Sequence, residues 1–120
     1  MSRAAAHAFE IEQARARLEA ADGGYEVVHS SPGLEIGVYV LVAPEPDHQQ
    51  PHADDEVYVV LGGRGVLNVE GEAIPVVEGQ AIFVPAGANH QFTGYEGLSV
   101  LVIFGRSAAA SGGEAVRATP

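Results

Sequence analysis

The fold of this chain is decided at residues 50–63, which read Gln-Pro-His-Ala-Asp-Asp-Glu-Val-Tyr-Val-Val-Leu-Gly-Gly. A second stretch, residues 79–90, reads Gly-Gln-Ala-Ile-Phe-Val-Pro-Ala-Gly-Ala-Asn-His. Each stretch joins a short apolar run to Gly and Pro residues, a pattern typical of strands separated by turns. Each also supplies side chains that bind divalent metals, namely His52 and Glu56 in the first and His90 in the second. The sequence therefore predicts strands that hold a site of two histidines and one carboxylate.

The rest of the chain continues this pattern from Tyr25 onward. Short apolar runs predict eight strands, at residues 25–30, 34–43, 56–61, 64–70, 73–77, 80–84, 90–93 and 97–104. Turn signals separate them at Gly62-Gly63, Glu70-Gly71, Glu78-Gly79 and Gly94. Many short strands of this kind indicate an all-β sandwich or small barrel. Within 34–43, period two places Leu34, Ile36, Val38, Val40 and Val42 on one face, which we expect to face the core.

Two of the predicted strands are apolar on both faces. They are residues 56–61 after Glu56, and residues 98–104. A strand of a small antiparallel sheet is apolar on both faces only if something covers its outer face. Residues 8–20 predict a short amphipathic helix that ends at Asp22-Gly23-Gly24. We expect that helix or a second copy of the chain to cover the outer faces of these two strands.

Length and composition set the class of protein. The 120 residues suit one domain, and 47% hydrophobic against 18% charged residues indicates a globular chain. We expect an N-terminal helical segment at 1–24, a β-barrel at 25–106 and a flexible tail at 107–120. A formal charge of −10 argues against nucleic-acid binding, and the absence of Cys restricts any metal to N and O ligands. No signal peptide or membrane span is evident, so we expect a cytoplasmic protein.

The spacing of the candidate ligands leaves two interpretations open. Buried together, two imidazoles and a carboxylate would each be costly without a partner, and one divalent cation would satisfy all three. Alternatively, His52 and His90 are surface loop residues and Glu56 is a solvated acid beside Asp54 and Asp55. Tyr58 and Phe92 share the parity of Glu56 and His90, so they line the same pocket or belong to the core.

The two stretches together resemble the paired motifs of the cupin family. The first motif, G-x5-H-x-H-x3,4-E-x6-G, is matched by His52, Glu56 and Gly63. The second, G-x5-P-x-G-x2-H-x3-N, is matched by Gly79, Pro85, Gly87 and His90. The chain departs from the pattern where Gln50 replaces the first His, Pro44 replaces the first Gly and Gly94 replaces the final Asn. The likeness covers about residues 34–104.

The resemblance implies a double-stranded β-helix, or jelly-roll, barrel with a metal inside it. His52, Glu56 and His90 would ligate one divalent transition ion (Fe, Mn, Ni, Cu or Zn), with Gln50 as an optional fourth ligand. His48 would lie at the mouth of the pocket with Tyr58 and Phe92. We expect a dioxygenase-type enzyme acting on a small organic molecule, with no assigned catalytic side chain. Alternatives are a non-catalytic small-molecule binding protein and an oxygen-independent isomerase or lyase. Cupins commonly form dimers, so a homodimer is expected.

Overall fold

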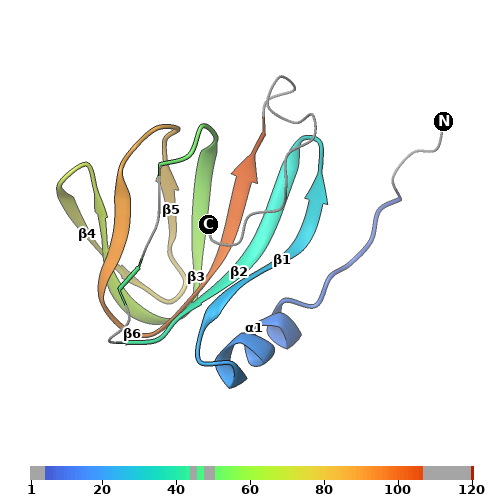
Figure 1. Cartoon of the computed structure of the whole chain (residues 1–120), viewed down its shortest axis with the longest axis horizontal. Helices are drawn as coiled ribbons and strands as arrows, with labels where there is room; N and C mark the ends of the chain where they lie inside the picture. Colours follow the sequence, from blue (N-terminus) through green and yellow to red (C-terminus); the bar gives the residue numbers. More distant parts are fainter. Residues whose placement is uncertain (1–4, 44–45, 48–50, 107–119) are drawn as a thin grey trace.

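The computed structural model describes residues 5–43, 46–47, 51–106 and 120. Within that part of the chain, one helix precedes six strands (Figure 1). The elements are α1 (Ile11–Ala20), β1 (Gly24–Ser31), β2 (Leu34–Leu41), β3 (Asp55–Val69), β4 (Glu72–Val77), β5 (Ala81–Val84) and β6 (His90–Gly105). The expected all-β class with one short N-terminal helix is confirmed. The tail expected at 107–120 lies outside the described residues except for Pro120.

The strands form one antiparallel sheet that rolls over on itself. Its order is β1-β2-β6-β3-β4, with β5 paired to β3. The first half of β3 pairs with β5 and with the second half of β6, whereas its second half pairs with β4 and with the first half of β6. In Figure 1 the two long strands curve, so that the halves of the sheet face each other. This arrangement is the expected jelly roll.

The two long strands correct the strand count. The sequence predicts a turn at Gly62-Gly63, but β3 continues through it, and β6 likewise continues through Gly94. The register between β3 and β6 shifts three times between Val60 and Val66, so bulges bend the strands without ending them. Gly63 permits the bend because its φ is 76° and a Cβ there would lie 2.2 Å from the carbonyl oxygen of Gly97. Two pairs of predicted strands therefore merge into β3 and β6, and the structure has six strands among the described residues where the sequence predicts eight.

Both faces of β2 are buried, whereas the sequence predicts burial for one of them. The larger core cluster contains Tyr39 and Leu41, which belong to the opposite face. Val38 and Val40, on the predicted core face, pack instead against Ala14 and Leu18 of α1. Val42 follows the strand and is exposed. The alternation follows the prediction, but both faces are buried because α1 covers one of them.

The helix begins later than expected, at Ile11, so Phe9 lies in the segment before it. Its buried side chains are Ala14 and Leu18, and its contacts are with β1 and β2. Leu61 and Leu101 pack partly against the same cluster, so α1 covers a part of the doubly apolar strands. No described helix is long and apolar enough to cross a membrane.

Candidate metal centre

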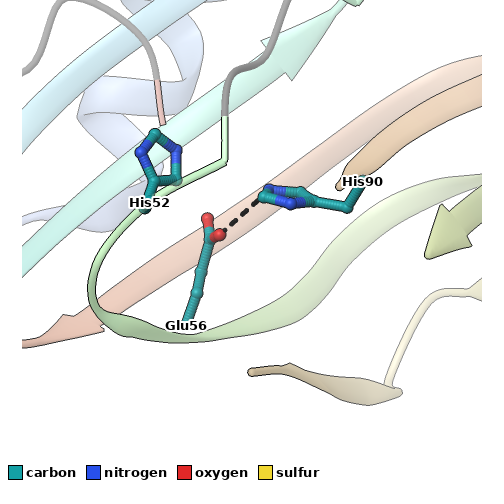
Figure 2. Close-up of side chains that lie close together, drawn as sticks. All are labelled: His52, Glu56 and His90. Carbon is teal, nitrogen blue, oxygen red and sulfur yellow. Dashed lines mark ion pairs between the residues drawn. The ribbon is translucent and has the colours of Figure 1, made fainter. Parts of the chain in front are cut away.

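The fold brings His52, Glu56 and His90 together inside the barrel (Figure 2). His52 lies in the loop before β3, Glu56 near the start of β3 and His90 at the first position of β6. In the sheet, Glu56 is registered with Phe104 and His90 with Val69, at opposite ends of the β3–β6 ladder. Rolling of the sheet is therefore what closes the distance between them.

The geometry suits a single ion. One ligand atom from each of the three residues lies within 4.8 Å of the other two. His90 Nε2 is 3.1 Å from Glu56 Oε1, and the side chains of both residues are 1% exposed. His52 is half-buried, with its ring centroid 5.8 Å from that of His90. His52 is thus the most exposed of the three residues.

Three polar atoms at this group have no hydrogen bond. Among the described residues, they are His52 Nε2 and both carboxylate oxygens of Glu56, of which Oε1 forms an ion pair with His90 Nε2. Burying such atoms unpaired costs free energy, and burying an unpaired carboxylate costs far more. A divalent cation between them would satisfy all three atoms. Two imidazoles and one carboxylate are also a donor set that divalent transition metals accept, so the residues present fit a metal ion.

The second nitrogen of His90 is fixed by the backbone. His90 Nδ1 lies 2.9 Å from the carbonyl oxygen of Ala88, which only accepts hydrogen bonds. Nδ1 therefore donates, and Nε2 faces Glu56, as expected for a metal-binding histidine oriented by a carbonyl. Burial lowers the pKa of His90, but the Glu56 carboxylate and the Ala88 carbonyl together raise it above its usual value. The contacts that favour a proton on Nε2 would equally favour a metal cation in its place.

Short backbone contacts hold the two ligand-bearing loops against each other. The N–H of Gly87 donates to the carbonyl of His52, at 2.7 Å. The N–H of Ala86 donates to Asp55 Oδ1, at 3.0 Å. Gly87 has a φ of 81°, and a Cβ added there would meet nothing within 4 Å. Glycine is therefore favoured at this position by its left-handed backbone conformation and not by a lack of space. Hydrogen bonds therefore connect the stretch that carries His52 and Glu56 to the stretch that precedes His90.

The predicted pocket residues have different surroundings. Tyr58 and Phe92 are fully buried, and their rings meet edge to face at 4.9 Å. The Tyr58 ring is 6.1 Å from that of His90, so it forms one wall of the site. Gln50 and His48 lie outside the described residues.

Two residues near the group were not singled out from the sequence. Phe104 packs edge-on against the His52 ring at 5.1 Å. Asp47 is buried, accepts from the Tyr39 hydroxyl at 2.6 Å and accepts from the Phe92 N–H at 2.8 Å. A pocket of about 290 Å³ lies beside it, lined in part by Ala43, Asp47 and Phe92. A single Asp in a loop gives no pattern from which this role could be predicted.

Comparisons with known proteins agree with the fold and the motifs. Residues 38–104, more than half of the chain, match the cupin domain family. The chain is 40% identical over 98 residues to an uncharacterized protein of Streptomyces coelicolor, covering 81% of this chain and 93% of that one. This chain therefore belongs to the cupin family.

Solved structures share the fold of this chain. The TT1209 protein of Thermus thermophilus superposes with a TM-score of 0.68 at 25% identity, covering 81% of this chain and 94% of that one. KdgF from a Halomonas species superposes with a TM-score of 0.64 at 19% identity, covering 72% of this chain and 82% of that one. At this identity, the similarity to KdgF concerns the fold alone.

Proposed function

We propose that this protein is a metal-dependent cupin enzyme of the dioxygenase type that acts on a small, neutral organic molecule. The observation that carries the proposal is the set of buried atoms without a hydrogen bond at His52 Nε2 and at both Glu56 oxygens, beside His90. Among the described residues, the ion pair of Glu56 Oε1 with His90 Nε2 is the contact that joins the candidate ligands to one another. The proposed ligands are His52, Glu56 and His90, with Gln50 as an optional fourth.

A bound ion of this kind would supply Lewis-acid polarisation and, if redox-active, reactivity toward O2. Three protein ligands leave coordination positions for other molecules. The residues of the chain hold and shield this centre: Glu56 offsets charge, the Ala88 carbonyl orients His90, and Phe104 and Tyr58 form apolar walls. Apolar walls exclude water and favour an organic substrate.

The preference for a neutral substrate rests on the arginines. The chain has no Lys, so arginine is the side chain that could bind an anionic group at all pH values. Every arginine in the described ranges already pairs with glutamate: Arg15 with Glu12 and Glu19, Arg17 with Glu26, Arg64 with Glu96 and Arg106 with Glu35. Among the described residues, a phosphate or carboxylate substrate would therefore find no unpaired arginine to bind.

One observation favours a second candidate, a binding protein without catalysis. The aromatic rings beside the ligand group belong to Phe104 and Tyr58, and the buried acid Asp47 is engaged with Tyr39 and the Phe92 N–H. No side chain described there is an evident general acid or base. An oxygen-independent isomerase or lyase is a third class with the same metal requirement.

Elemental analysis of the purified protein tests the metal first. We expect the wild type to hold about one equivalent of metal per chain more than a His52→Ala, His90→Ala double variant does. Glu72→Gln, which changes an exposed carboxylate, is the matched control and should keep the metal. Absence of metal from the wild type after loading with each candidate ion would remove the proposal.

Activity then separates the three classes. The loaded protein is screened against small organic molecules with and without O2. Turnover that requires O2 supports the dioxygenase, and turnover without O2 identifies the isomerase or lyase. Tight binding without turnover identifies the binding protein.

We also propose a homodimer formed through the outer face of the sheet. The register aligns Phe83, Val57, Ile103 and Ile36 in one row across β5, β3, β6 and β2. Phe83 is 59% exposed, although it is large and apolar. A second copy placed on this row would bury it. Light scattering should give twice the 12.4 kDa of one chain, and Phe83→Glu should give the single mass.

A further inference from the structure

A second group of histidines lies outside the barrel, where the segment before α1 passes beside β1 (Figure 1). The His29 ring stacks on Phe9, with centroids 5.7 Å apart at 25°. The His7 ring contacts both, at 5.8 Å from Phe9 and 5.2 Å from His29. The metal centre uses none of these three residues.

A bulge in β1 turns His29 toward this segment. The register with β2 shifts between Val27, opposite Gly37, and His29, opposite Ile36. Strict alternation would place His29 on the same face as Val27. The extra residue instead places it with Ile36, on the side where β2 packs against α1. Bulges commonly re-aim a side chain in this way.

The neighbours of the two rings favour one arrangement of their protons. His7 Nδ1 is 3.1 Å from the Ala5 carbonyl oxygen, which only accepts, so Nδ1 donates. The Ser31 hydroxyl lies 3.4 Å from the Leu34 carbonyl oxygen and 3.0 Å from His29 Nε2, so when it donates to the carbonyl it accepts from Nε2. With neutral rings in this arrangement, the remaining nitrogens, His7 Nε2 and His29 Nδ1, both carry lone pairs. They face each other 3.4 Å apart.

Two lone pairs at this distance repel unless a cation lies between them. Two imidazole nitrogens bound to one tetrahedral Zn²⁺, each at about 2.0–2.1 Å, are separated by about 3.3–3.4 Å. The spacing of His7 Nε2 and His29 Nδ1 matches that separation. The other nitrogen of each ring contacts an acceptor, the Ala5 carbonyl for His7 and the Ser31 hydroxyl for His29. Metal-bound histidines commonly have such an orienting partner on the nitrogen that does not bind the metal.

We propose that His7 and His29 form a second site, for a divalent transition metal ion, that fastens the N-terminal segment to β1. Imidazole pairs favour Zn²⁺, Cu²⁺ and Ni²⁺ over Mg²⁺ and Ca²⁺. Water completes the coordination at the exposed side, because His7 is exposed and His29 half-buried. The formal charge of −10 raises the local concentration of cations around the chain. The site does not depend on the function proposed for the barrel.

The test removes the barrel site first. In the His52→Ala, His90→Ala background, Zn²⁺ is titrated calorimetrically at neutral pH. We expect one equivalent of Zn²⁺ to bind, and binding to be lost on adding His7→Ala or His29→Ala. Ser31→Ala, which removes an orienting partner, should weaken binding by about 10-fold. His48→Ala is the matched control, because it removes a histidine and should leave the titration unchanged.

A second readout locates the ion without relying on the variants. Cu²⁺ added below one equivalent to the same background should broaden the amide resonances of His7, Phe9 and His29 selectively, because they lie nearest the ion. Absence of Zn²⁺ binding would mean that the two rings share a proton instead, and would overturn the proposal. Binding that survives loss of His7 and His29, disappears with His48, or broadens resonances elsewhere would overturn it too.

Discussion

Glu35 and Glu56 are both buried completely, at 0% and 1% exposure, but the surroundings of their carboxylates differ. Glu35 Oε2 accepts from the Tyr25 hydroxyl at 2.8 Å, and Oε1 pairs with the guanidinium of Arg106. The Glu56 oxygens have no hydrogen bond within the described structure and face two histidines. A buried charge must be compensated. A permanently charged arginine compensates Glu35, whereas Glu56 pairs with His90, a residue that can also bind a metal cation.

The compensated glutamate also joins strands. Arg106 follows β6 and donates to the Ser31 carbonyl of β1 at 3.0 Å, while Glu35 belongs to β2. The pair thus connects β1, β2 and the end of β6. We infer that Glu35 contributes to folding, whereas Glu56 belongs to the proposed metal site.

The largest effect is expected at the compensated pair. Arg106→Met leaves Glu35 buried without its cation, so the free energy of unfolding should fall by about 3–5 kcal/mol in urea denaturation. A Glu35→Leu, Arg106→Met double variant should recover much of the loss, because neither charge remains. Stability within about 0.5 kcal/mol of the wild type would show that Glu35 is not compensated in this way.

A smaller effect is expected at the proposed metal site. Saturating the wild type with metal at about 100 times Kd should raise the free energy of unfolding by about 2.7 kcal/mol, and a chelator should reverse this. Glu56→Gln should show a smaller rise. Without metal this variant should lose less stability than Arg106→Met does, because His90 can give up its proton once the Glu56 carboxylate is gone, whereas an arginine or its buried partner cannot be neutralised so easily. A loss as large as that of Arg106→Met would mean that Glu56, like Glu35, is held by a structural ion pair.

The third prediction tests the packing around Glu35. A Cβ at Gly37 would lie 2.3 Å from the Tyr25 ring, which carries the hydroxyl bonded to Glu35. Gly37→Ala should therefore cost about 1–3 kcal/mol in thermal or urea unfolding. Gly33→Ala is the matched control, because a Cβ there meets nothing within 4 Å. Equal stability of the two variants would show that the Tyr25 ring moves freely.

The smallest effect at neutral pH concerns Asp47, a buried carboxylate bonded to Tyr39. Burial and the Asp47 carboxylate raise the pKa of the Tyr39 hydroxyl well above its usual value. The protonated phenol is favoured in the fold, so its contribution is complete below the unfolded pKa and is lost as pH rises above about 10. Stability should then fall by up to about 1.4 kcal/mol per pH unit. Tyr39→Phe should show a shallower fall in urea denaturation over the alkaline range, and an identical slope would contradict the assignment.

Much of the fold followed from local patterns, and the errors share one cause. Short apolar runs and turn residues predicted the strands, and the turns at Glu70-Gly71 and Glu78-Gly79 lie between β3, β4 and β5 as expected. Gly62-Gly63 carries the same local signal, but the pairing of β3 with β6 extends across it as a bulge. A glycine permits a bend or a turn equally well, and only the partner strand decides which forms.

The sequence by itself determined the family, the strand content and the identity of the three candidate ligands, because motif spacing and alternation are local properties of the chain. Tertiary structure alone decided that His90 meets Glu56 across the rolled sheet, that β2 buries both faces, and that Glu35 finds Arg106. It also placed His7 against His29, 22 residues apart. These contacts join residues distant in sequence, and their geometry depends on the curvature of the whole sheet, which no single segment encodes.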